Sequence, residues 1–160
     1  MQAQNPLGIA PVGGLIAKFA IPAIISMLVS AMYNIVDQIF IGQGVGMLGN
    51  AATNVAFPVT TVATALALLL GIGGASNYNL EMGAGQEKKA SGIAGTALSS
   101  LASSGLILAV IVLMFLKPLL TLFGATADVM PYAVDYTGIT ALGLPFYILS
   151  VGGNHIVRAD

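Results

Sequence analysis

Hydrophobic residues in this sequence form four long blocks, separated by short stretches rich in glycine, polar and charged residues. The blocks cover about residues 15–41, 50–78, 90–116 and 132–157. Each block is longer than the roughly 20 apolar residues that a helix needs to cross the hydrocarbon core of a bilayer. Their hydrophobicity is continuous rather than alternating, which favours membrane helices over the strands of a membrane barrel. The sequence therefore predicts an all-α integral membrane fold with four transmembrane helices.

The stretches outside these blocks are predicted to be irregular. Residues 1–14 contain two prolines and three glycines, and we interpret them as a cytoplasmic or interfacial lead-in to a membrane segment at 15–160. Residues 42–49 form an uncharged glycine-rich link, and residues 81–89 form a polar one. Residues 119–131 make a short, partly apolar connection, in which Gly124, Thr126 and Asp128 are candidate helix-stop and capping residues.

The scarcity and placement of charge support a membrane location and predict an orientation. Only 7% of the residues are charged, against about 25% in ordinary soluble domains. In the four-helix arrangement, Lys117 alone falls on one side of the membrane. The other four basic residues fall on the opposite side: Lys18, Lys88, Lys89 and Arg158. Because basic loops favour the cytoplasm, both termini of this segment are predicted to be cytoplasmic.

The first hydrophobic block contains a polar stripe that ends in a carboxylate. Ser30, Tyr33, Asn34 and Asp37 recur at helical spacing and therefore share one face. A carboxylate at membrane depth is costly unless it faces protein or a water-filled cavity, so Asp37 is a candidate functional residue. Along a helix, however, Asp37 lies roughly 28 Å beyond Lys18, where it could reach water at the membrane boundary. The residues alone leave both interpretations open.

Further candidates lie in the second block and at three prolines. Asn54, Thr61 and Thr64 lie close to one helical face, where they could line a cavity or bond to neighbouring backbone. A proline inside a helix removes one backbone hydrogen bond and favours a bend. The helix-bending candidates are Pro22, Pro58 and Pro145.

Several function classes are not supported by the sequence. Residues 44–49 match the pattern G-x-G-x-x-G, but a neutral apolar block follows and the next acidic residue is only Glu81, so a dinucleotide site is not predicted. The single histidine, His155, has no pattern of metal ligands around it, and there are no cysteines. No arrangement of residues indicates an enzyme, and we expect no organic cofactor and no nucleic-acid partner.

Short motifs spread along almost the whole chain provide a family resemblance. They lie at residues 34–42, 49–58, 71–76, 83–85, 122–125, 143–146 and 158–160. In this order they resemble the MATE (multidrug and toxic compound extrusion) family of cation-coupled antiporters. The resemblance implies a twelve-helix transporter of the plasma membrane with two six-helix lobes. This chain is similar to the first part of the N-terminal lobe.

The resemblance also implies alternating access and a role for individual residues. Family members would export cationic, amphipathic organic compounds in exchange for Na⁺ or H⁺. Asp37 matches the first-helix acid associated with cation coupling, so a Na⁺ ion is implied there if Na⁺ is the coupling ion. Pro22 matches a first-helix proline linked to bending. The family's other cation ligands in this lobe lie on later helices that this sequence does not contain.

The leading hypothesis is therefore a fragment of a secondary multidrug antiporter. Its expected partners are the lipid bilayer, cationic amphipathic small molecules, and either the remainder of the transporter or further copies of the chain. One alternative is a small four-helix transporter that assembles as an oligomer around Asp37. Others are a membrane interaction module without transport, and a polysaccharide or lipid flippase of the same wider superfamily.

Overall fold

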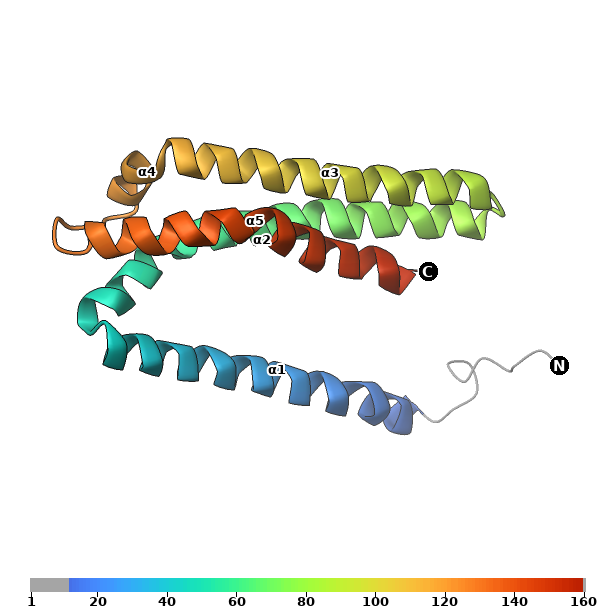
Figure 1. Ribbon diagram of the computed structural model, residues 1–160. Coiled ribbons are helices and arrows are strands. Elements are labelled where there is room, and N and C mark those ends of the chain that lie inside the picture. Colours follow the sequence, from blue (N-terminus) through green and yellow to red (C-terminus); the bar gives the residue numbers. More distant parts are fainter. Residues whose placement is uncertain (1–11, 160) are drawn as a thin grey trace. The chain divides into compact units, whose positions relative to one another are not determined.

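The computed structural model describes residues 12–159, all of whose regular elements are helices (Figure 1). They are α1 (Val12–Gly44), α2 (Met47–Gly83), α3 (Glu87–Met114), α4 (Leu116–Leu122) and α5 (Met130–Ala159). Four of these helices, α1, α2, α3 and α5, are long and apolar enough to cross a membrane. The predicted all-α fold with four membrane-spanning helices is confirmed.

The first helix begins earlier than the sequence pattern suggested. The lead-in was predicted to be irregular to residue 14, but α1 already begins at Val12. Glycines such as Gly13 weaken a helix by only about 1 kcal/mol each, and the next proline after Pro11 is Pro22, so nothing prevents helix formation. Residues 1–11, which make up the rest of the predicted lead-in, lie outside the described residues.

The connection predicted at residues 119–131 also differs, because it overlaps the short helix α4. Helix α3 ends at Met114, and α4 runs from Leu116 to Leu122. Gly124 then adopts a φ of 91°, in the left-handed region. The amide of Gly124 donates to the carbonyl of Thr121 at 3.1 Å, and that of Ala125 donates to Leu120 at 2.9 Å. These two bonds form a Schellman motif, which confirms Gly124 as the stop residue.

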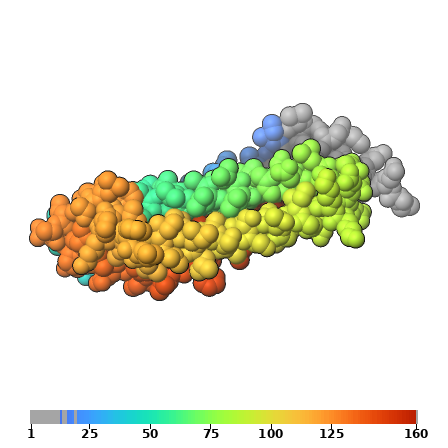
Figure 2. All heavy atoms as spheres, turned by 90° about the horizontal axis from the view of Figure 1, so that it is seen from above, coloured from blue at the N-terminus to red at the C-terminus, as the bar shows by residue number. Residues whose placement is uncertain are grey.

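The chain divides into two compact units, Met1–Gly46 and Met47–Asp160. Helix α1 belongs to the first unit, and the other helices form the second. In the second unit, α2, α3 and α5 run side by side, and α4 lies at one end of them (Figures 1 and 2). Their shared core includes Ala67, Leu101 and Ile148, each fully buried.

Glycines allow the three long helices of the second unit to approach closely. A Cβ atom added at Gly71 of α2 would lie 2.7 Å from the Cα atom of Gly152 in α5. A Cβ added at Gly105 of α3 would lie 2.7 Å from the Cα atom of Pro145 in α5. Small residues at such crossings are a common means of packing membrane helices. Backbone therefore touches backbone at the centre of this bundle.

The three candidate bending prolines all lie inside long helices. Pro22 is in α1, Pro58 in α2 and Pro145 in α5. Figure 1 shows α2 and α5 changing direction part-way along their lengths. Each proline lacks the N–H that would bond to the carbonyl of the preceding turn, and this loss permits a helix to bend.

Candidate functional site

The polar residues of α1 lie within a single helix, where their spacing places them on one face. Asn34 lies one turn after Ser30, and its side-chain nitrogen donates to the Ser30 carbonyl oxygen at 2.9 Å. Tyr33 and Asp37 are also one turn apart on this face. Asp37 lies seven residues before the end of α1 at Gly44, or roughly 10 Å along the helix axis. Its role in cation coupling stays a prediction.

The candidate residues of α2 share a face and bond to their own helix. The side-chain nitrogen of Asn54 donates to the carbonyl of Asn50 at 2.9 Å. The Thr61 hydroxyl lies 3.0 Å from the carbonyl oxygen of Phe57, to which it donates. In the same way, the Thr64 hydroxyl donates to Thr60 at 2.8 Å. A hydroxyl has one hydrogen, so Thr61 and Thr64 present oxygen lone pairs to their surroundings rather than a second donor.

A hydrogen bond joins this face of α2 to α5. The hydroxyl oxygens of Thr64 and Tyr147 lie 2.9 Å apart. Because the hydrogen of Thr64 is directed to the Thr60 carbonyl, Tyr147 must be the donor in this contact. Tyr147 is 41% exposed, so its ring remains open on one side. Both residues lie near the middle of their helices, at the depth of the membrane core.

Helix α5 has two unlike exposed edges. One carries polar and small residues at helical spacing: Tyr136, Thr140, Gly143, Tyr147, Ser150 and Asn154. The other edge carries large apolar side chains that are 65–77% exposed, namely Ile139, Leu142, Phe146 and Val157. Helical spacing also places Asp135 with Leu142, on the apolar edge. The polar edge adjoins α2 through Tyr147 and Thr64.

We use the name α2–α5 face for the surface formed by Asn54, Thr61, Thr64, Thr140 and Tyr147. Thr140 resembles the threonines of α2, since its hydroxyl donates to the carbonyl of Tyr136 at 2.8 Å. None of these five side chains is charged, and the three threonine hydroxyls donate into their own helices. The α2–α5 face is therefore rich in hydrogen-bond acceptors. Among the described residues, no group of three His, Cys, Asp or Glu side chains is placed to hold a metal ion.

The α2 half of this face was predicted from the sequence, but Tyr147 and Thr140 of α5 were not. The available signal was the spacing of polar residues on α5, where Tyr136, Thr140, Gly143 and Tyr147 recur every three or four positions. Which of the two edges of α5 meets α2 depends on helix rotation, which the sequence pattern does not give. The structure brings Thr64 and Tyr147 together.

Apolar helices of membrane-spanning length, with an uncharged polar face at mid-span, define a multi-pass membrane protein. The MatE family model matches residues 22–160, and the chain therefore belongs to the MatE family of membrane transporters. The predicted family resemblance is confirmed.

Three similar proteins illustrate the range of this family. An FAD transporter of Shewanella oneidensis is 28% identical, over 99% of this chain and 35% of its own length. The multidrug export protein MepA of Staphylococcus haemolyticus is 30% identical, over 82% of this chain and 29% of its own. The probable multidrug resistance protein YoeA of Bacillus subtilis is 25% identical, over 82% of this chain and 28% of its own length. The chain thus spans about a third of the length of these curated relatives. No solved structure matches it.

Proposed function

We propose that this chain forms the first four membrane-spanning helices of a secondary antiporter that exports cationic organic compounds from the cell in exchange for Na⁺ or H⁺. Membership of the MatE family supports transport, and the names of the MepA and YoeA relatives support multidrug export. The observation that carries the substrate class is the α2–α5 face, because its chemistry suits a cation. The plasma membrane is the proposed location.

The α2–α5 face offers two kinds of interaction to an organic cation. The oxygens of Thr61, Thr64 and Tyr147 can accept hydrogen bonds from an ammonium or amidinium group. The ring of Tyr147, which is 41% exposed, can contact a cation through its π face. No fixed charge lies among the five residues of the face, so affinity would depend on shape and many weak contacts. Such a surface fits a transporter with several amphipathic substrates.

Asp37 is the proposed coupling acid. It is the only acidic residue of α1, and the next one along the chain is Glu81, near the end of α2. Bound H⁺ or Na⁺ can drive transport only if the carboxylate binds it with different affinity in two conformations. Asp37 would therefore exchange its cation between the two sides as the transporter alternates.

The test uses the complete natural polypeptide that contains residues 1–160, in everted vesicles with an imposed Na⁺ or proton gradient. The measured quantity is accumulation of a fluorescent organic cation. Asp37→Asn preserves the size of the side chain but removes its charge, and we expect gradient-driven accumulation to disappear at normal protein levels. Asp135→Asn is the matched control, because Asp135 lies exposed near the start of α5, and it should transport normally. Full transport by Asp37→Asn would refute the coupling role.

A second substrate class is favoured by one relative. The Shewanella oneidensis protein that aligns with 99% of this chain is named an FAD transporter. FAD carries negatively charged phosphates, which an acceptor-rich surface does not bind well. In the same vesicles we expect the organic cation to accumulate and FAD not to compete with it. Accumulation of FAD without the cation would replace the multidrug proposal with dinucleotide transport.

A further inference from the structure

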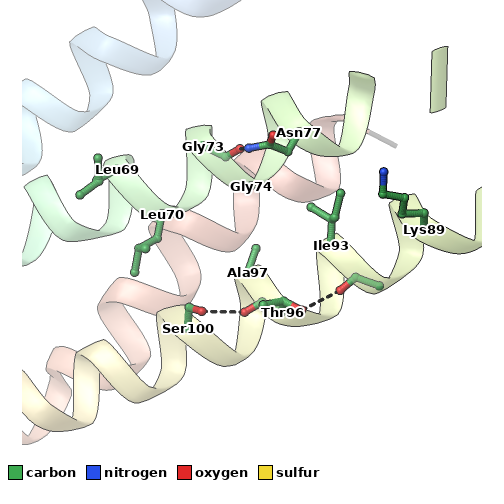
Figure 3. Close-up of a pocket in the computed structure, with 11 residues that line it drawn as sticks. Leu69, Leu70, Gly73, Gly74, Asn77, Lys89, Ile93, Thr96, Ala97 and Ser100 are labelled. Carbon is green, nitrogen blue, oxygen red and sulfur yellow. Dashed lines mark hydrogen bonds between the residues drawn. The ribbon is translucent and has the colours of Figure 1, made fainter. Parts of the chain in front are cut away.

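A groove runs between α2 and α3 on the surface of the second unit, apart from the α2–α5 face. Its volume is about 670 Å³. Figure 3 shows the side chains that line it. Those of α2 are Leu69, Leu70, Gly73, Gly74 and Asn77, and those of α3 are Lys89, Gly92, Ile93, Thr96, Ala97 and Ser100.

The groove is charged at one end and uncharged along the rest of its length. At the charged end, the Lys89 ammonium lies 2.7 Å from a carboxylate oxygen of Glu81, next to the turn that joins α2 and α3. Figure 3 shows Leu69 and Leu70 toward the opposite end. Since α2 and α3 are long enough to cross the membrane, their connecting turn lies at a membrane surface. The groove therefore leads from a charged membrane surface into the apolar core.

The polar groups in the middle of the groove are already engaged with their own helices. The side-chain nitrogen of Asn77 donates to the carbonyl of Gly73 at 2.8 Å. Thr96 donates to the carbonyl of Gly92 at 2.9 Å, and Ser100 donates to that of Thr96 at 2.8 Å. These hydroxyl hydrogens do not require a partner from outside. An apolar occupant can lie against Thr96 and Ser100 without leaving their hydroxyl hydrogens unsatisfied.

The shape of the groove suits a chain of methylene groups. A Cβ atom added at Gly73 or Gly92 would meet nothing within 4 Å, so the space above both glycines is open. The α3 side of the groove extends from Lys89 to Ser100, which is roughly 16 Å along the helix axis. This length accommodates much of one acyl chain in a single leaflet, whose hydrocarbon is about 15 Å deep.

We propose that this groove binds a zwitterionic phospholipid, with one acyl chain against Leu70, Ile93 and Ala97 and the headgroup at the Lys89–Glu81 pair. The Lys89 ammonium has three hydrogens, so hydrogens remain for the lipid phosphate after one is directed to Glu81. The Glu81 carboxylate, which pairs with Lys89 beside the groove, would receive the ammonium of an ethanolamine headgroup. A basic pocket without an acid would select an anionic lipid. The neutral pair here complements a headgroup that carries both charges.

The order of chemistry along the groove favours a lipid over a further membrane helix. A phospholipid has its charges at the membrane surface and only hydrocarbon below them, and the groove has the same order. A helix seated between α2 and α3 would also contact the groove along its length, but it has no charged headgroup at one end. It would therefore gain little from the Lys89–Glu81 pair. The proposal is independent of the transported substrate, because the groove lies on a different pair of helices from the α2–α5 face.

The test is native mass spectrometry of the complete natural polypeptide in a mild detergent, titrated with phosphatidylethanolamine or phosphatidylglycerol of identical acyl chains. We expect the wild type to bind phosphatidylethanolamine more tightly. Gly92→Leu fills the groove and should weaken that binding about tenfold, which corresponds to the loss of a few buried methylene groups. Gly95→Leu is the matched control, because a Cβ at Gly95 also meets nothing within 4 Å, and Gly95 does not line the groove. Glu81→Gln leaves the Lys89 ammonium without its acid and should therefore shift the preference toward phosphatidylglycerol.

Three results would overturn the proposal. One is equal or tighter binding of phosphatidylglycerol by the wild type. Another is an equal effect of Gly92→Leu and Gly95→Leu on lipid binding. The third is a photo-reactive residue at position 93 that crosslinks to another segment of the polypeptide rather than to lipid, which would show that protein fills the groove.

Discussion

The hydroxyl groups of Thr64 and Tyr147 meet at 2.9 Å, midway along two membrane-spanning helices. Water is scarce at this depth, so each polar group must find a partner within the protein or carry a cost. The Thr64 hydroxyl is satisfied by its own helix and in turn accepts the hydrogen of Tyr147. This arrangement fixes the direction of the phenol and leaves its ring exposed on the α2–α5 face.

Removing the Tyr147 hydroxyl should separate its two roles. Tyr147→Phe retains the ring but loses one oxygen acceptor, and we expect the half-saturating concentration of an organic cation to rise roughly two- to tenfold. Tyr147→Ala also removes the ring and should have a larger effect. The control is Tyr132→Phe, on the same helix with a similar exposure of 42%. Unchanged substrate affinity in Tyr147→Ala would remove this residue from the proposed binding surface.

Helices α2, α3 and α5 are held at short distances by glycines, and this contact makes a prediction about stability. A Cβ added at Gly152 would lie 2.8 Å from the carbonyl oxygen of Ala67 and would overlap Leu101. Backbone cannot give way easily, so we expect Gly152→Ala to destabilise the bundle by about 1–3 kcal/mol. The measurement is the midpoint of thermal aggregation of detergent-purified protein.

Another glycine of α5 provides the control for this substitution. A Cβ at Gly143 meets nothing within 4 Å, and Gly143 is exposed. Gly143→Ala should therefore leave stability unchanged or raise it by up to about 1 kcal/mol, because alanine favours helix. If both alanine variants had the same midpoint, the close approach of α2 and α5 would be wrong.

Hydropathy predicted the long helices because a run of apolar residues is itself the requirement for crossing a bilayer. It did not predict α4, whose seven residues lie between the phenylalanines at positions 115 and 123 and include Pro118, which indicates a break. Gly71 of α2 packs against Gly152 of α5, and nothing in the sequence pattern indicates that these two glycines meet. For the same reason Asn54, Thr61 and Thr64 were found from sequence and Tyr147 was not. Sequence periodicity shows which residues share a face of one helix. Which residues of two helices touch depends on how each helix is rotated about its axis, and periodicity does not give this.

For the chain as a whole, the distribution of basic residues makes a prediction about orientation. Cysteines are introduced singly at Met47, which is 88% exposed at the start of α2, and at Gln86, in the exposed turn before α3. The chain has no cysteine of its own to confuse the result. A membrane-impermeant thiol reagent should label Met47→Cys in intact cells and Gln86→Cys only after permeabilisation. Labelling of both from outside would contradict the proposed orientation.

Residues 1–160 expressed alone should insert into membranes but should not export organic cations. Insertion requires only apolar helices of sufficient length, and four are present among the described residues. Coupled export requires two parts that enclose a site and rock against each other. We expect purified residues 1–160 in vesicles to show no gradient-dependent uptake. Uptake that disappears in Asp37→Asn would instead support the self-assembled four-helix transporter.

The turn between α2 and α3 has a consequence for biosynthesis. Only Ala84, Gly85 and Gln86 separate the two helices, and Gly85 adopts a φ of 74° that reverses the chain at once. Three residues span at most about 11 Å, far less than the roughly 30 Å of bilayer hydrocarbon. The turn therefore cannot cross the hydrocarbon, so the end of α2 and the start of α3 lie at the same membrane surface. A lone inserted α2 would leave the apolar α3 in water. We therefore expect the nascent chain to release α2 and α3 into the bilayer together, as one hairpin.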